Sequence, residues 1–248
     1  MTNNIYFIAN WKMYGSTSSL NSLNKVINLS KLKKYKKAKI IYFPPFTLIH
    51  NFINKFKNSK ISIGGQNCHV VEDYGSFTGS ISSKMLKELG CKYVIIGHSE
   101  NRIAGETDLD INKKIHSAIN KNLKIVFCIG ETLNEKRKQI TFSVLKRQIN
   151  KGLKNIKNYK NILIAYEPVW SIGTGVIPNG KELELNIFKI KKIISKKTKK
   201  KLPILYGGSV NNKNIKSIKN ITGIKGFLIG SASQNSKKFI DIIKKTIN

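Results

Sequence analysis

Short runs of apolar residues recur along the chain and alternate with longer stretches that have helical spacing. The runs are rich in isoleucine, valine, tyrosine and phenylalanine, and continuous apolarity of this kind is typical of strands covered on both faces, as in parallel sheets. Eight runs have this character: IYFIANWK (5–12), IIYFPP (40–45), ISIGGQN (61–67), YVIIGHSE (93–100), IVFCIGE (125–131), ILIAYEP (162–168), PILYGGS (203–209) and GFLIGSA (226–232).

The stretches between the runs place apolar residues at i, i+3, i+4 and i+7, as in SSLNSLNKVINLSKL (18–32) and LELNIFKIKKIISKK (183–197). Alternation of strand and helix indicates βαβ units with right-handed crossovers. Eight such units in 248 residues predict an α/β fold, a closed (β/α)8 barrel of eight parallel strands, and one domain over residues 1–248. The alternative is an open doubly wound sheet, but NWKMYG after the first run lacks the glycine-rich fingerprint of that fold.

Almost every run ends in polar or glycine residues. In a barrel of parallel strands the carboxyl ends of the strands carry the active site, so these residues are candidates for it. Helix capping explains some of them, but it does not easily explain Lys12, His98, Glu100 and Glu167 together. The full set is Asn10, Lys12, Asn67, His98, Glu100, Glu131, Glu167, Gly207, Gly208 and Gly230.

Six short motifs resemble those of the triosephosphate isomerase family in order and approximate spacing: NWKMYG, IIGHSE, CIGE, AYEPVWSIGTG, YGGSV and GFLIGSAS. The resemblance covers nearly the whole chain. It implies an aldose–ketose isomerase that interconverts dihydroxyacetone phosphate and D-glyceraldehyde 3-phosphate through an enediolate, without a metal or cofactor. That chemistry needs a base at the carbon acid, an electrophile for the oxygens and a site for the phosphate.

The resemblance also implies the catalytic residues. Glu167 matches the family's base and His98 its neutral electrophile, and this family is a well-known example of that pair of groups. Lys12 matches the cation that faces the substrate, with Asn10 beside it. Glu100 matches a second carboxylate, expected to pair with Lys12, and either a role near the reacting centre or a plain ion pair fits it.

Phosphate binding is implied for Gly173, Ser209, Gly230 and Ser231, whose counterparts in the family bind phosphate oxygens through backbone amides. This agrees with the general location of phosphate after strands 7 and 8 of such barrels. The segment PVWSIGTG (168–175) is expected to be a mobile lid that excludes water from the intermediate. Cys128 and Glu131 are expected to be structural, with Cys128 packed behind Glu167.

A homodimer is the expected assembly, because CHVVEDYGSFTGSIS (68–82) is long for a βα loop and resembles the family's intersubunit loop. Thr78 would then reach the Asn10 and His98 region of the partner. Two positions depart from the family pattern: Asn101 replaces a usual arginine and Ser80 a usual acid, which together tend to form an intersubunit ion pair. Val176 and Ser231 also differ from the usual lysine and glycine.

Composition adds one extreme value, a net charge of +32. A basic protein invites a nucleic-acid hypothesis, but the lysines are spread along the expected helices and accompany asparagine and isoleucine, which favours compositional drift. We therefore expect a triose phosphate substrate and no specific nucleic-acid or membrane partner. A different phosphate-binding barrel, such as an epimerase or synthase, and a basic scaffold protein remain as alternatives.

The remaining features indicate a soluble protein of the reducing cytoplasm. No apolar run approaches the roughly 18 residues of a membrane helix, and the first residues do not resemble a secretory signal. Three scattered cysteines (Cys68, Cys91 and Cys128) indicate neither a disulfide framework nor a zinc site. The other three histidines (His50, His69 and His116) lack metal-ligand spacing.

Overall fold

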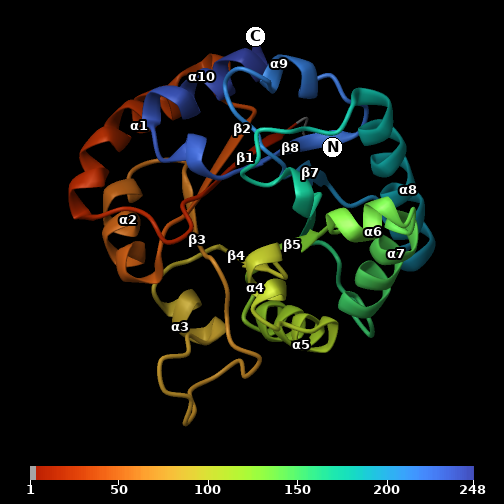
Figure 1. Ribbon diagram of the computed structural model, residues 1–248. Coiled ribbons are helices and arrows are strands. Elements are labelled where there is room, and N and C mark those ends of the chain that lie inside the picture. The colour runs from red at the N-terminus through yellow and green to blue at the C-terminus, as the bar shows by residue number, and fades with distance from the viewer. Residues whose placement is uncertain (1–3) are drawn as a thin grey trace.

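The computed structural model describes residues 4–248, and their strands close into a barrel in which each strand pairs in parallel with its neighbours along the chain (Figure 1). Pairing of β1 with β8 completes the closure, with Tyr6 opposite Gly226. The predicted eight-stranded parallel barrel is confirmed and the open sheet is excluded. The strands are β1 (Ile5–Asn10), β2 (Ala38–Phe43), β3 (Ser62–Gly65), β4 (Tyr93–Ile96), β5 (Lys124–Ile129), β6 (Ile162–Tyr166), β7 (Ile204–Tyr206) and β8 (Ile224–Ile229).

Helices form a ring around this barrel, and a long segment between β3 and α3 projects from it at the bottom of Figure 1. The α-helices are α1 (Asn24–Lys31), α2 (Ile49–Phe56), α3 (Ser83–Glu88), α4 (Ser99–Ile103), α5 (Asp108–Asn120), α6 (Leu133–Arg137), α7 (Thr141–Gly152), α8 (Gly180–Thr198), α9 (Ile215–Ile218) and α10 (Ser236–Ile247). Short 3-10 helices are η1 (Thr17–Leu23), η2 (Lys33–Tyr35), η3 (Phe46–Leu48), η4 (Val169–Ser171) and η5 (Ser231–Ser233). No helix of residues 4–248 has the length and apolarity needed to span a membrane.

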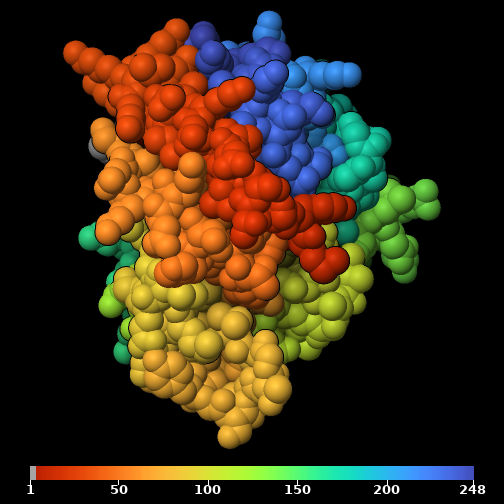
Figure 2. All heavy atoms as spheres, turned by 90° about the vertical axis from the view of Figure 1, so that its left-hand side faces the viewer, coloured from red at the N-terminus to blue at the C-terminus, as the bar shows by residue number. Residues whose placement is uncertain are grey.

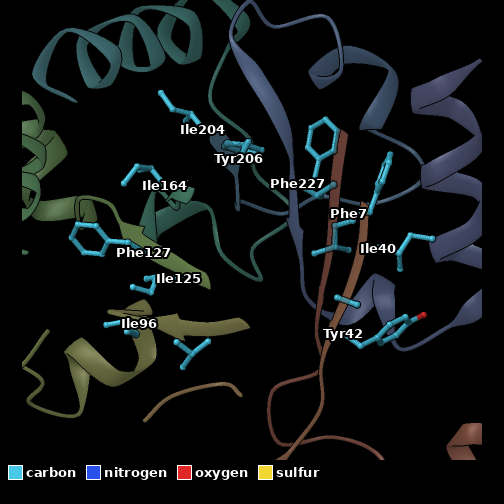
Figure 3. Close-up of a cluster of buried hydrophobic side chains, with 14 of the residues drawn as sticks. Phe7, Ile40, Tyr42, Ile96, Ile125, Phe127, Ile164, Ile204, Tyr206 and Phe227 are labelled. Carbon is cyan, nitrogen blue, oxygen red and sulfur yellow. The ribbon is translucent and has the colours of Figure 1, made fainter. Parts of the chain in front are cut away.

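Alternate residues of every strand except β3 belong to two separate cores. One set packs against the helices and includes Phe7, Phe127 and Phe227, whose side chains are seen in Figure 3. The other set fills the inside of the barrel and includes Ile8, Val126 and other strand residues only. Burial on both faces explains why the strands read as continuous apolar runs. Truncating a fully buried ring such as Phe127 to alanine would cost about 3–5 kcal/mol.

Candidate active site

A cavity of about 720 Å³ opens at the carboxyl ends of the strands. All the residues predicted to be catalytic or to bind phosphate line it: Asn10, Lys12, His98, Glu100, Glu167, Gly173, Ser209, Gly230 and Ser231. They come from the ends of five different strands (β1, β4, β6, β7 and β8) or the loops that follow. Closure of the barrel therefore brings together residues that are up to 221 positions apart in the sequence.

Glu167 follows β6 directly, and its backbone N–H donates to the carbonyl of Ile129 at 2.8 Å. Its side chain is buried, and its Oε2 has no hydrogen-bond partner among the described residues. Two glycines make room for it. A β-carbon at Gly130 would lie 1.8 Å from the Glu167 carbonyl oxygen, and one at Gly207 would lie 2.5 Å from its Cγ. The glycines of the CIGE and YGGSV motifs are thus needed to place this carboxylate.

His98 is the N-cap residue of α4, and its Nδ1 accepts a hydrogen bond from the backbone N–H of Glu100 at 3.3 Å. Because Nδ1 accepts this hydrogen bond, the proton of the neutral ring is assigned to Nε2. Nε2 lies 3.5 Å from Oε1 of Glu167. The imidazole N–H and the carboxylate therefore face the same part of the cavity.

Lys12 lies just beyond β1 in a left-handed backbone conformation, with φ of 54°. That conformation is rare for lysine and is held by two contacts: the Lys12 N–H donates to Oδ1 of Asn10, and its carbonyl accepts from Nε2 of Gln66 at 2.7 Å. The ammonium donates to Oε1 of Glu100 at 2.6 Å, which is the predicted pairing. Glu100 is itself about half exposed at the cavity rim.

At the ends of β7 and β8, and in the segment after β6, the cavity offers backbone amides. The N–H groups of Gly173, Ser209, Gly230 and Ser231 donate to no other residue in the described part of the chain. Ser231 begins η5, where the first amides of a helix have no intrahelical acceptor. Gly230 has open space above it, since the nearest atom to a β-carbon there would be Cε of Lys12 at 3.7 Å. Unpaired amides near an ammonium favour an anionic ligand.

The segment expected to be a lid contacts the rest of the site through Ser171 and Gly175. Ser209 accepts from the Gly175 N–H at 3.1 Å and donates to the Ser171 carbonyl at 2.5 Å. Ser171 Oγ lies 3.2 Å from the Tyr206 hydroxyl. Gly173 and Gly175 have φ of 73° and 80°, the left-handed region that glycine adopts without strain. The segment lies over the cavity, where Gly173 and Gly175 are part of the lining.

Glu131 supports the near end of this segment from below the cavity. Its carboxylate is completely buried, and it accepts from Nε1 of Trp170 at 2.9 Å and from the Tyr166 hydroxyl at 3.2 Å. Nδ2 of Asn186 donates in turn to the Tyr166 hydroxyl at 2.9 Å. Burial raises the pKa of Glu131, and the hydrogen bonds from Trp170 and Tyr166 oppose that rise. Glu131 thus has the structural position expected of it.

Two other expectations concern residues outside the cavity lining. Asn67, a strand-end candidate, accepts from Nζ of Lys114 at 3.1 Å and lines a separate small cavity instead. Cys128 points into the barrel, where burial and the neighbouring charge of Glu167 raise the pKa of its thiol. Among residues 4–248 no three histidine, cysteine, aspartate or glutamate side chains are placed to hold a metal ion.

Sequence reasoning missed the residue that holds the Lys12 backbone. Gln66 donates from one Nε2 to the carbonyls of both Lys12 and Phe43, so it ties the end of β2 to the loop after β1. Gln66 directly follows the apolar residues ISIGG (61–65), and this position at a strand end could have marked it as a candidate site residue. Tyr206 was missed as a contact of Ser171 because a strand tyrosine usually packs in the core.

Comparisons with known proteins match nearly the whole chain to one family. The family model described as "Triosephosphate isomerase" matches residues 5–246. A triosephosphate isomerase of Geotalea uraniireducens is 40% identical over 242 residues, covering 95% of this chain and 96% of the relative. One of Dictyoglomus thermophilum is 41% identical over 243 residues, covering 95% and 97%. The crystal structure of triosephosphate isomerase from Bartonella henselae superposes with a TM-score of 0.88 at 32% identity, covering 98% of each chain.

Proposed function

The chain belongs to the triosephosphate isomerase family, and on that premise we propose which of its residues interconvert dihydroxyacetone phosphate and D-glyceraldehyde 3-phosphate. Glu167 is the base. It takes a proton from one carbon and returns it to the adjacent carbon, while the electrons of the broken C–H bond move to the carbonyl oxygen and form an enediolate. The carboxylate is buried at the end of β6, in the same cavity as the other catalytic candidates.

His98 and Lys12 stabilise the negative charge that develops on the substrate oxygens. The Nε2–H of His98 donates to these oxygens and relays a proton between them, which the neutral tautomer does without carrying a positive charge. The ammonium of Lys12 supplies that charge, with Asn10 fixing its backbone. Glu100 holds the ammonium at 2.6 Å, so its role is to position Lys12.

The substrate phosphate binds the backbone amides of Gly173, Ser209, Gly230 and Ser231, which line the same cavity as Glu167. The segment 168–175 closes over it, and its bond to Ser209 couples closure to the phosphate site. Exclusion of water prevents the enediolate from losing its phosphate in a side reaction.

One observation carries the proposal: Oε2 of Glu167 is a buried carboxylate oxygen with no hydrogen-bond partner among residues 4–248, and it lies in a cavity that also holds the imidazole of His98. An unpaired buried carboxylate costs folding energy, so its retention favours a role with a ligand. Glu167→Gln tests it. The variant should retain its fold and its KM within a small factor and lose about 100- to 10,000-fold in kcat. A raised KM with unchanged kcat would exclude the role.

We further propose that the enzyme acts as a homodimer. The segment between β3 and α3 forms a folded arm: the His69 N–H donates to the Ile81 carbonyl at 2.8 Å, and the His69 and Phe77 rings lie 4.4 Å apart. Figure 2 shows this arm, in gold, projecting at the lower edge. Met13 beside the active site is 93% exposed and Phe77 46%, apolar area that suits an interface. Thr78 at the tip of the arm would reach the partner's Asn10 and the partner's His98.

Residues 1–248 are proposed to form one catalytic domain that works in the cytoplasm. The family model spans residues 5–246 and the barrel uses strands from both ends of the chain, which supports a single unit. The cysteines Cys68, Cys91 and Cys128 are all buried free thiols, which suits a reducing compartment.

A further inference from the structure

Another cavity, of about 380 Å³, lies at the opposite end of the barrel from the catalytic cavity, where the strands begin. Its lining includes the two tyrosines Tyr6 and Tyr93, the two lysines Lys124 and Lys160, and Asn161. A volume of this size is enough for a small ligand. The site is separated from the catalytic cavity by the side chains that fill the barrel interior.

The charged side chains of this cavity are both cations, and its two tyrosine hydroxyls and the Asn161 amide can donate hydrogen bonds. Neither tyrosine hydroxyl is hydrogen-bonded to another residue of the described chain, and Tyr93 keeps its proton because burial raises its pKa to about 12. The ammonium of Lys124 lies 5.4 Å from the Tyr93 ring centroid. Within residues 4–248, Lys124 and Lys160 form no ion pair with a carboxylate. Donors and unpaired cations together select an anion.

The surroundings add charge of the same sign. The four residues before each strand contain no aspartate or glutamate. Exposed lysines stand at the start of seven of the eight strands: Lys39, Lys60, Lys92, Lys124, Lys160, Lys201 and Lys225.

The carboxyl ends of the helices also face this mouth, because each helix ends where the next strand begins. Lys124 lies four residues after the end of α5, so the negative pole of that helix offsets part of its charge. Lys160 lies eight residues after the end of α7, beyond the last turn in which that effect acts.

We propose that this cavity, at the amino-terminal mouth of the barrel, binds a small polyanion that carries phosphoryl groups. Lys124 and Lys160 contact its phosphoryl oxygens, the Tyr6 and Tyr93 hydroxyls donate to it, and the neighbouring lysine ring raises its local concentration. Occupancy relieves the repulsion between the lysines, so the ligand stabilises the folded enzyme by mass action.

The test is calorimetric titration of the intact enzyme with inorganic triphosphate and, separately, with ATP, in chloride buffer at fixed ionic strength. Binding of both shows that the phosphate chain is recognised, whereas binding of ATP alone shows that the nucleoside is required. The variant Lys124→Gln with Lys160→Gln should weaken binding about tenfold or more, as loss of two charge-assisted contacts implies. The control Lys25→Gln with Lys146→Gln removes the same charge from exposed positions on α1 and α7.

The control variant should bind as the wild type does, and both double variants should retain the wild-type KM for glyceraldehyde 3-phosphate, since neither changes the catalytic cavity. Equal loss of affinity in the two double variants would overturn the proposal, because it would show a general charge effect. Undiminished binding in Lys124→Gln with Lys160→Gln, or no binding of either probe to the wild type, would overturn it as well.

Discussion

Replacing Gly207 with alanine should move the catalytic carboxylate without disturbing the fold. A β-carbon at this position would lie 2.5 Å from Cγ of Glu167, whereas ordinary contacts are 3.4–4 Å, so Glu167 must shift by about 1 Å. Gly207 does not have a positive φ, so alanine adopts its backbone conformation without strain. The side chain of Glu167 can move into the open cavity, so the free energy of unfolding should fall by only about 1 kcal/mol, which corresponds to roughly 2–4 °C in Tm.

Catalysis is far more sensitive to that displacement, since misplacement of a reacting group by 1 Å costs about 100-fold in rate. Steady-state assays of Gly207→Ala should therefore show kcat reduced by about that factor. The control is Gly180→Ala at the start of α8, where the added carbon would lie 3.6 Å from Ile221 and nothing must move. A Gly207→Ala enzyme with wild-type kcat, or one that fails to fold, would refute the reasoning.

Three further changes have defined outcomes. Burial raises the pKa of Glu131 above its usual 4.5, so the wild type loses stability as the pH rises from about 4.5 through the raised value and loses no more above it. The Tm of Glu131→Gln relative to the wild type should therefore rise across that range and then level off, and a difference in Tm that does not change with pH would contradict this. The double substitution Ser80→Glu with Asn101→Arg should restore an ion pair between subunits and so lower the dimer dissociation constant, measured by sedimentation over a dilution series. An unchanged dissociation constant would show that these two positions do not meet across the interface. The net charge of +32 should attract the anionic substrate to the enzyme. Raising the chloride concentration until the Debye length is about 8 Å should therefore lower kcat/KM and leave kcat nearly constant. A kcat/KM that does not change with chloride would exclude electrostatic steering of the substrate.

The fold was predictable because burial on both faces of the strands leaves a plain signature in the sequence. Runs such as IVFCIGE and ILIAYEP form adjacent strands, β5 and β6, with Phe127 opposite Ile164. What the runs could not define was their length. β3 covers only Ser62–Gly65, because the chain leaves the ladder where Gln66 turns its side chain back to β1 and β2.

The site was predictable as a set of residues but not as a geometry. Lys12, His98 and Glu167 each end an apolar run, so barrel closure alone brings them together. The tautomer of His98 could not be read from sequence, because it depends on a single backbone hydrogen bond from Glu100. The lysine-rich mouth could not be predicted either, because its lysines lie at the starts of seven strands that are far apart in the sequence.

Deuterium incorporation from heavy water tests the central claim, that Glu167 moves a carbon-bound proton through an enediolate. With wild-type enzyme and glyceraldehyde 3-phosphate in D2O, NMR should show deuterium entering the carbon-bound positions of the product as isomerisation proceeds, because a carboxylic acid formed at Glu167 exchanges its proton with solvent. Glu167→Gln should lose incorporation and isomerisation together while retaining its Tm. Isomerisation by the wild type without any deuterium, or incorporation by Glu167→Gln at the wild-type rate, would contradict the account.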